Sequence, residues 1–200
     1  MDQTYIKKIT WARNAVWPMI ILSAVLGVAG FIQGFSGVVK PPLAMQVALW
    51  GVQLLSVAAI IIYLMGFWAI AKRYNQRKLT GGVGTLLAVT IVGLVVGPVL
   101  SYFVSQQTPE AMSIGIAFFM LAYFIAVLVA MGVGYILLGL GLKKLDAQLG
   151  PRSRTMGNLF LASGICTLTL IGIFPALILW IIAYIMSYFL FSEELARAQG

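Results

Sequence analysis

The sequence contains no histidine, and only 9% of its 200 residues are charged. Histidine is the usual haem ligand, a common zinc and copper ligand and the usual general base near neutral pH, so its absence argues against much metal and acid–base chemistry. The single cysteine, Cys166, lies in an apolar run and cannot form an intramolecular disulfide. We therefore predict no cofactor, no metal site and no catalytic residues, and we expect that the protein is not an enzyme.

Long apolar runs are the most prominent feature of the chain, in which 62% of the residues are hydrophobic. The longest charge-free run extends from Ala111 to Leu142, between Glu110 and Lys143. A helix over this run would be ~48 Å long, which exceeds the ~30 Å hydrocarbon core of a bilayer. A membrane-spanning strand would need only ~10 residues of alternating character. The pattern predicts an all-α integral membrane protein.

The chain is predicted to form one membrane domain with five transmembrane helices. These cover residues 15–39, 43–71, 81–104, 111–142 and 157–191, and a C-terminal tail covers 192–200. Residues 1–14 are basic and aromatic, which is typical of a segment at the membrane surface. Five crossings would place the two termini on opposite sides of the membrane.

The basic residues predict the orientation of these helices. If the N-terminus is inside, only Lys40 and Arg197 fall on the outer side. The inner side then holds Lys7, Lys8, Arg13, Lys72, Arg73, Arg77, Lys78, Lys143, Lys144, Arg152 and Arg154. Because cytoplasmic loops are enriched in lysine and arginine, we predict a multi-pass protein of the cell membrane with the N-terminus cytoplasmic and the C-terminus outside.

The second and fourth predicted helices begin and end alike. Pro42 and Pro109 each open a Pro-x-Ala-Met sequence, and both helices end in a basic pair. This similarity indicates two tandem helical hairpins, 42–104 and 109–191, added to one N-terminal helix. The alternative is a chance alignment, since apolar sequences with prolines in their loops align easily.

Three groups of residues are candidate contact sites. Small residues along the first helix could form a helix-packing face: Ser23, Gly27, Gly30, Gly34 and Gly37. Gln46 and Gln53 could share a face of the second helix, where they would line a pore or form interhelical hydrogen bonds. Basic residues of two loops could contact anionic lipid headgroups: Lys72, Arg73, Arg77, Lys78, Lys143, Lys144, Arg152 and Arg154.

The second half of the chain, from Gly134 to Leu190, has a Gly/Leu-rich helix, a Lys-Lys-Leu loop, a glycine-containing helix and an aromatic end. In this pattern it resembles small polytopic membrane proteins of unknown function found in archaea, a resemblance that implies no catalytic residues.

Two functions are compatible with the sequence. One is a non-catalytic accessory or structural subunit of a larger membrane complex, such as a respiratory or transport assembly. The alternative is a small pore or carrier for a neutral or lipid-like solute. The expected partners are the lipid bilayer and other membrane subunits or further copies of the chain, but not nucleic acid.

Overall fold

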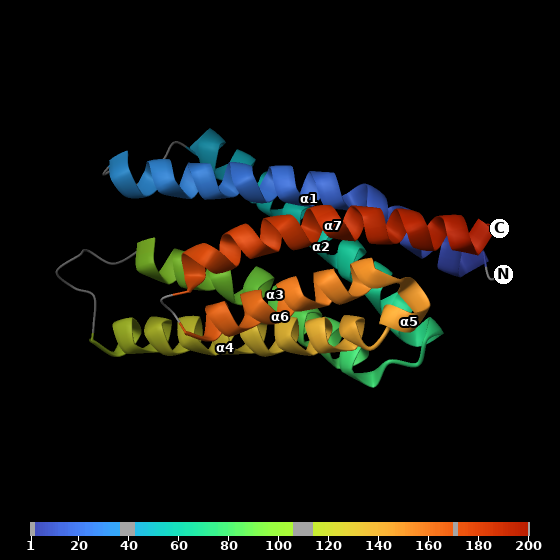
Figure 1. Ribbon diagram of the computed structural model, residues 1–200. Helices are drawn as coiled ribbons and strands as arrows, with labels where there is room; N and C mark the ends of the chain where they lie inside the picture. Colours follow the sequence, from blue (N-terminus) through green and yellow to red (C-terminus); the bar gives the residue numbers. More distant parts are fainter. Residues whose placement is uncertain (1–2, 37–42, 106–113, 170–171, 200) are drawn as a thin grey trace. The chain divides into compact units, whose positions relative to one another are not determined.

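The computed structural model describes residues 3–36, 43–105, 114–169 and 172–199, and every regular element in these ranges is a helix (Figure 1). The helices are α1 (Gln3–Ser36), α2 (Leu43–Arg73), α3 (Arg77–Ser105), α4 (Ile114–Lys143), α5 (Asp146–Leu149), α6 (Pro151–Leu168) and α7 (Ile173–Gln199). Five of them, α1, α2, α3, α4 and α7, are long and apolar enough to cross a membrane. The predicted all-α membrane fold is thus confirmed.

The helices form two compact units. Unit 1 comprises Met1–Ala69 and Tyr184–Gly200, and unit 2 comprises Ile70–Ala183. The predicted tandem hairpins do not match this division, because most of α2 belongs to unit 1 whereas α3 and α4 both belong to unit 2. The structure therefore groups α3 with the helix that follows it, across the predicted boundary between the hairpins.

Unit 1 is a three-helix arrangement with an aromatic centre. The rings of Tyr63 and Phe67 on α2 lie 6.0 Å and 4.9 Å from the ring of Phe191 on α7, between ring centroids. A Cβ atom placed on Gly66 of α2 would overlap the side chain of Ala12 on α1. Close contact at this glycine lets α1 pack against α2 beside the aromatic cluster.

The predicted surface segment and C-terminal tail both belong to long helices in the structure. α1 begins at Gln3 and α7 continues to Gln199, so residues 3–14 and 192–199 are helical. Five buried residues of α1 repeat at spacings of three and four, with Ala15 buried beside them: Tyr5, Ile9, Ala12, Val16 and Met19. This spacing forms one apolar helix face, which explains why the basic and aromatic segment continues the first helix.

Unit 2 is built around α4, which packs against α6 through paired glycines. A Cβ atom on Gly139 would lie 2.5 Å from the carbonyl oxygen of Gly157, and one on Gly164 would lie 2.7 Å from that of Gly132. The two pairs run in opposite directions along the sequence, so α4 and α6 are antiparallel. Any larger residue at these positions would push the two backbones apart.

A second glycine face of α4 contacts α3. A Cβ atom on Gly82 of α3 would lie 2.5 Å from the backbone nitrogen of Leu138, and one on Gly141 would lie 2.6 Å from the Cβ atom of Leu79. Gly134 likewise faces Leu86. Because the two glycine faces of α4 are distinct, this helix holds a close neighbour on each side.

The predicted single helix 157–191 is two helices in the structure. α6 ends at Leu168, and α7 starts at Ile173, where the backbone nitrogen of Ala176 donates to the carbonyl oxygen of Gly172 at 2.8 Å. A Cβ atom on Gly172 would lie 2.5 Å from the carbonyl oxygen of Cys166, so the tight reversal requires glycine. Pro175 falls in the first turn of α7, where its missing N–H leaves no helical hydrogen bond unmade.

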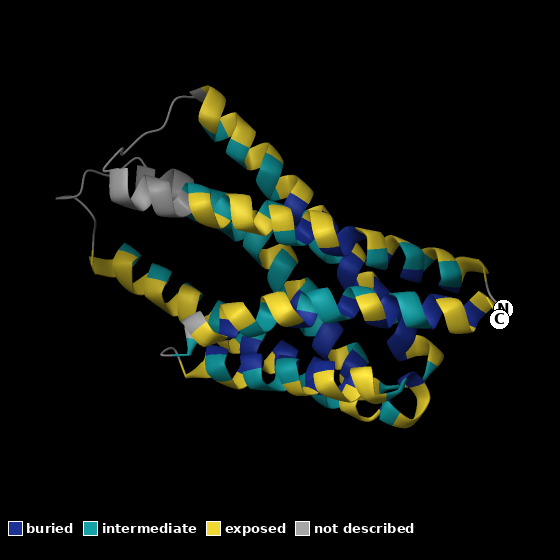
Figure 2. Ribbon diagram, turned by 45° about the horizontal axis from the view of Figure 1, so that its top comes forward, coloured by how far each residue is buried: buried dark blue, intermediate teal, exposed yellow. Residues whose placement is uncertain are grey.

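Within unit 1, a hydrogen bond joins the first helix to the last. The hydroxyl of Tyr5, near the start of α1, donates to Oε1 of Glu194, near the end of α7, at 2.6 Å. The two ends of the described chain therefore lie together in unit 1 (Figure 1), whereas the sides of the membrane that they face stay a prediction. Within α1 the buried residues lie between Tyr5 and Met19, whereas Ile21 and Val25 are exposed (Figure 2).

The glycine contacts of α4 give a direct stability prediction. We expect Gly139→Ala to lower the free energy of unfolding by about 1–3 kcal/mol, because the added methyl group overlaps the backbone of α6. Gly27→Ala is the matched control, since no heavy atom of the described residues lies within 4 Å of a Cβ atom there. This control should leave stability unchanged or raise it by up to about 1 kcal/mol. Thermal unfolding in detergent measures both, and equal effects would contradict the packing of α4 on α6.

Candidate functional site

The turn between α2 and α3 brings basic residues together at one end of unit 2. Asn75 adopts a positive φ of 50°, a conformation that asparagine tolerates better than most residues. The backbone nitrogen of Gln76 donates to the carbonyl oxygen of Ala71 at 2.9 Å and closes the turn. Arg73 thus ends one helix and Arg77 begins the next, with only three residues between them.

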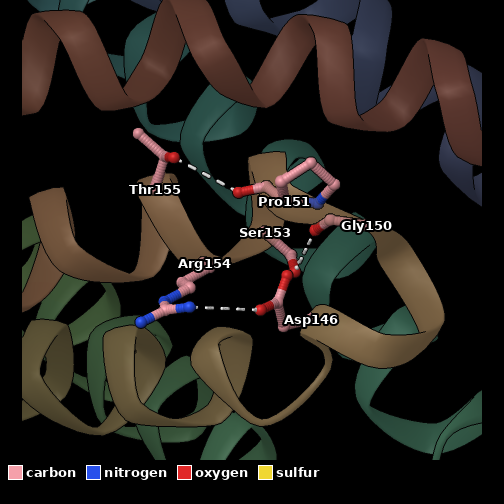
Figure 3. A network of polar contacts seen from close by, with 6 residues as sticks. All are labelled: Asp146, Gly150, Pro151, Ser153, Arg154 and Thr155. Carbon is pink, nitrogen blue, oxygen red and sulfur yellow. Dashed lines mark hydrogen bonds and ion pairs between the residues drawn. The ribbon is translucent and has the colours of Figure 1, made fainter.

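The connection between α4 and α6 is a second compact reversal (Figure 3). Gly150 has φ 82°, and Pro151 occupies the first position of α6, where proline is favoured. The hydroxyl of Ser153 donates to the carbonyl oxygen of Gly150 at 2.9 Å. Arg154 lies 3.9 Å from the carboxylate of Asp146, measured from Nη1 to Oδ2. These contacts fix the start of α6 and the direction in which its basic residues leave the helix.

Helix packing brings the two reversals to the same end of unit 2. Gly141 near the end of α4 meets Leu79 near the start of α3, and the side-chain stem of Lys143 crosses Gly157 of α6. We call the resulting surface the basic end. It consists of eight exposed residues, Lys72, Arg73, Arg77, Lys78, Lys143, Lys144, Arg152 and Arg154. These are the residues that the sequence predicted as lipid contacts, and all of them belong to unit 2.

The basic end has few acidic residues in its own unit. Asp146 is the only acidic residue among the described residues of unit 2. α3 and α6 have no acidic residue in their first turns, and α6 has no side-chain cap. Because a helix N-terminus carries partial positive charge, cations at Arg77 and Arg152 are placed where helix stability disfavours them. Helix stability therefore does not explain the charges at the starts of α3 and α6.

Only two residues of the predicted small-residue face of α1 can be placed in the structure. Ser23 and Gly27 are exposed. For Gly30 and Gly34 the structure describes the helix but not the burial, and Gly37 lies outside the described residues. The role of this face as a packing surface thus stays a prediction, and any partner of Ser23 and Gly27 must come from outside the described chain.

Four glycines of the transmembrane helices have no heavy atom of the described residues within 4 Å of a Cβ atom placed on them. We call Gly27, Gly51, Gly93 and Gly97 the open glycines. Gly93 and Gly97 are four residues apart on α3, in a GxxxG sequence that the sequence analysis did not single out. The glycines of α4 and α6 were also missed, although seven-residue spacings such as that from Gly132 to Gly139 mark them.

The two predicted intramembrane glutamines, Gln46 and Gln53, are half-buried on α2. A buried polar contact between α2 and α7 was not predicted. The hydroxyls of Tyr63 on α2 and Ser187 on α7 lie 2.8 Å apart. Sequence reasoning could not pair residues so far apart in the chain. Among the described residues, no group of three or more histidine, cysteine, aspartate or glutamate side chains is placed to hold a metal ion.

Glu194, in the segment predicted as a C-terminal tail, is a buried carboxylate. Glu194 is 1% exposed, and its Oε1 atom accepts the hydrogen bond from the hydroxyl of Tyr5. Its second oxygen, Oε2, lies 4.0 Å from Nη1 of Arg197 one turn later. The carboxylate thus connects α1 to α7 by polar contacts at the ends of both helices.

Comparisons with protein-family models, with curated proteins and with solved structures found no match to this chain. Two surfaces of the molecule are candidate functional sites. They are the basic end of unit 2 and the helix faces that carry the open glycines.

The contact between Tyr5 and Glu194 predicts a further effect on stability. Tyr5→Phe removes one hydrogen bond to a buried carboxylate, and we expect a loss of about 1.5–3 kcal/mol in the free energy of unfolding. The matched control is Tyr123→Phe on α4, because the Tyr123 hydroxyl has no hydrogen-bond partner among the described residues. Faster amide hydrogen exchange over 190–199 in Tyr5→Phe alone would locate the effect. Unchanged exchange there would contradict the contact.

Proposed function

We propose that this chain is a non-catalytic structural subunit of a larger membrane protein complex. The observation that carries the proposal is the division of its glycines into two groups. Glycines such as Gly139 and Gly82 hold helices of unit 2 in close contact, whereas the open glycines face no described residue. Between helices in lipid, small residues allow the backbones to approach and so promote association.

The open glycines would be costly if their faces met only lipid. Glycine in a helix interior is about 0.8–1.0 kcal/mol less favourable than alanine, and a lipid chain gains nothing from the missing methyl group. Gly93 and Gly97 lie on the same face of α3 because residues four apart are one turn apart. A transmembrane helix of another subunit would use this face in the way that α6 uses the glycines of α4.

The intramembrane polar groups support a structural role better than a chemical one. The hydroxyl of Thr167 donates to the carbonyl oxygen of Ser163 at 2.8 Å, and the hydroxyls of Tyr63 and Ser187 bind each other. A catalytic serine needs a base within hydrogen-bond reach. The partner of Ser187 is a tyrosine hydroxyl, which is a poor general base near neutral pH.

We also propose that both ends of the described chain face the cytoplasm at the cell membrane. This orientation requires α6 to cross the membrane in addition to the five long apolar helices. All lysines and arginines of the chain except Lys40 then fall on the cytoplasmic side. This distribution follows the positive-inside rule more closely than the orientation predicted from five crossings, because Arg197 moves to the cytoplasmic side.

Purification from native membranes in mild detergent tests the subunit role. We expect larger membrane proteins to co-purify with the chain in fixed stoichiometry, and the double variant Gly93→Leu/Gly97→Leu to lose them. Val95→Leu is the matched control, since Val95 is an exposed residue of the same helix and is already large.

Thermal unfolding of the double variant shows whether its own fold is intact. If instead the chain purifies as a stable homo-oligomer that gives solute flux in liposomes, the subunit role is contradicted and the alternative of a small pore or carrier is favoured. Retention of the partners by the folded double variant would show that the open glycines of α3 are not the contact.

A further inference from the structure

We propose that the basic end of unit 2 binds the phosphate headgroups of anionic phospholipids in the leaflet that it faces. Eight exposed lysines and arginines meet there, and Asp146 is the only acidic residue among the described residues of this unit. The inference does not depend on the proposed subunit role, because it concerns this chain alone in a bilayer.

The position of these cations favours lipid over any other anion. Lys72 and Lys143 directly follow the apolar parts of α2 and α4, so their side chains begin where the hydrocarbon of the bilayer ends. The stem of Lys143 lies along Gly157 of α6, which leaves its ammonium group free to extend toward the headgroup layer. Clusters of this kind next to transmembrane helices are attracted to anionic lipids.

The positive charges at the starts of α3 and α6 favour binding of an anion next to these two helix N-termini. Arg77 and Lys78 open α3, and Arg152 and Arg154 lie in the first turn of α6, so each helix N-terminus adds partial positive charge to its own cations. A phosphate group would be attracted both by these side chains and by the backbone N–H groups at a helix start. The guanidinium groups can contact phosphate through two parallel hydrogen bonds.

Replacement of Asp146 tests the direction in which the preference for anionic lipids changes. Its carboxylate lies 3.9 Å from Arg154 and neutralises part of the surface (Figure 3). Replacing it with asparagine removes one negative charge and leaves the shape nearly unchanged. If the surface binds anionic headgroups, Asp146→Asn should strengthen the preference for them, whereas loss of a purely structural ion pair would only lower stability.

The experiment uses the full chain in vesicles of phosphatidylcholine with a minor fraction of phosphatidylglycerol. Electron spin resonance of spin-labelled lipids measures the preference of the protein for phosphatidylglycerol. We expect the variant Arg77→Gln/Lys78→Gln/Arg152→Gln/Arg154→Gln to lose this preference by roughly tenfold. Asp146→Asn should increase the preference, and added salt should weaken it in the wild-type protein.

Two controls make the result specific. Lys7→Gln/Lys8→Gln removes two cations from α1 in unit 1 and should change the preference much less. The variant Arg77→Lys/Arg152→Lys/Arg154→Lys keeps the charge and should keep most of the preference. Equal preferences in the wild-type protein and the folded four-residue glutamine variant would overturn the proposal. Loss of the preference on adding inorganic phosphate, at matched ionic strength, would also overturn it in favour of a site for a soluble anion.

Discussion

Helices in lipid gain no hydrophobic driving force from touching one another, so their backbones must come close enough for dispersion contacts to favour association. α4 meets this constraint on two sides at once. Gly132 and Gly139 admit α6, and Gly134 and Gly141 admit α3, because residues seven apart lie two turns apart on the same face. The packing of α3 and α6 in unit 2 therefore depends on glycines of the most apolar helix of the chain.

The antiparallel contact between α4 and α6 also arranges the start of α6 beside the end of α4. α6 ends at Leu168, the backbone turns at Gly172, and α7 then runs back. Within unit 1, a 2.6 Å hydrogen bond from Tyr5 to Glu194 joins the last helix to the first. The basic end follows from the contact between α4 and α6, since the start of α6 carries Arg152 and Arg154 to the surface next to α4.

Apolar run length predicted the helical membrane fold, because only the length and the absence of charge were needed. Run length did not predict the break between α6 and α7, because Thr169 and Gly172 carry no charge and so do not interrupt the apolar run. Pro175 was a usable signal, since proline is favoured in a first helical turn. The burial of Glu194 could not be predicted, because its partner Tyr5 lies at the opposite end of the sequence. The basic residues were predicted well because charge alone selects them, whereas the contacts that gather them depend on glycines of other helices.

The central claim is that the chain reverses between α6 and α7 and returns its C-terminal end to the side of its N-terminal end. Single cysteines at Lys7 and Gln199, each in a Cys166→Ser background, test it most directly, since both positions are exposed. In sealed, oriented vesicles a membrane-impermeant maleimide should label both cysteines from the same face. Labelling of the two positions from opposite faces would contradict the reversal and restore a five-crossing topology.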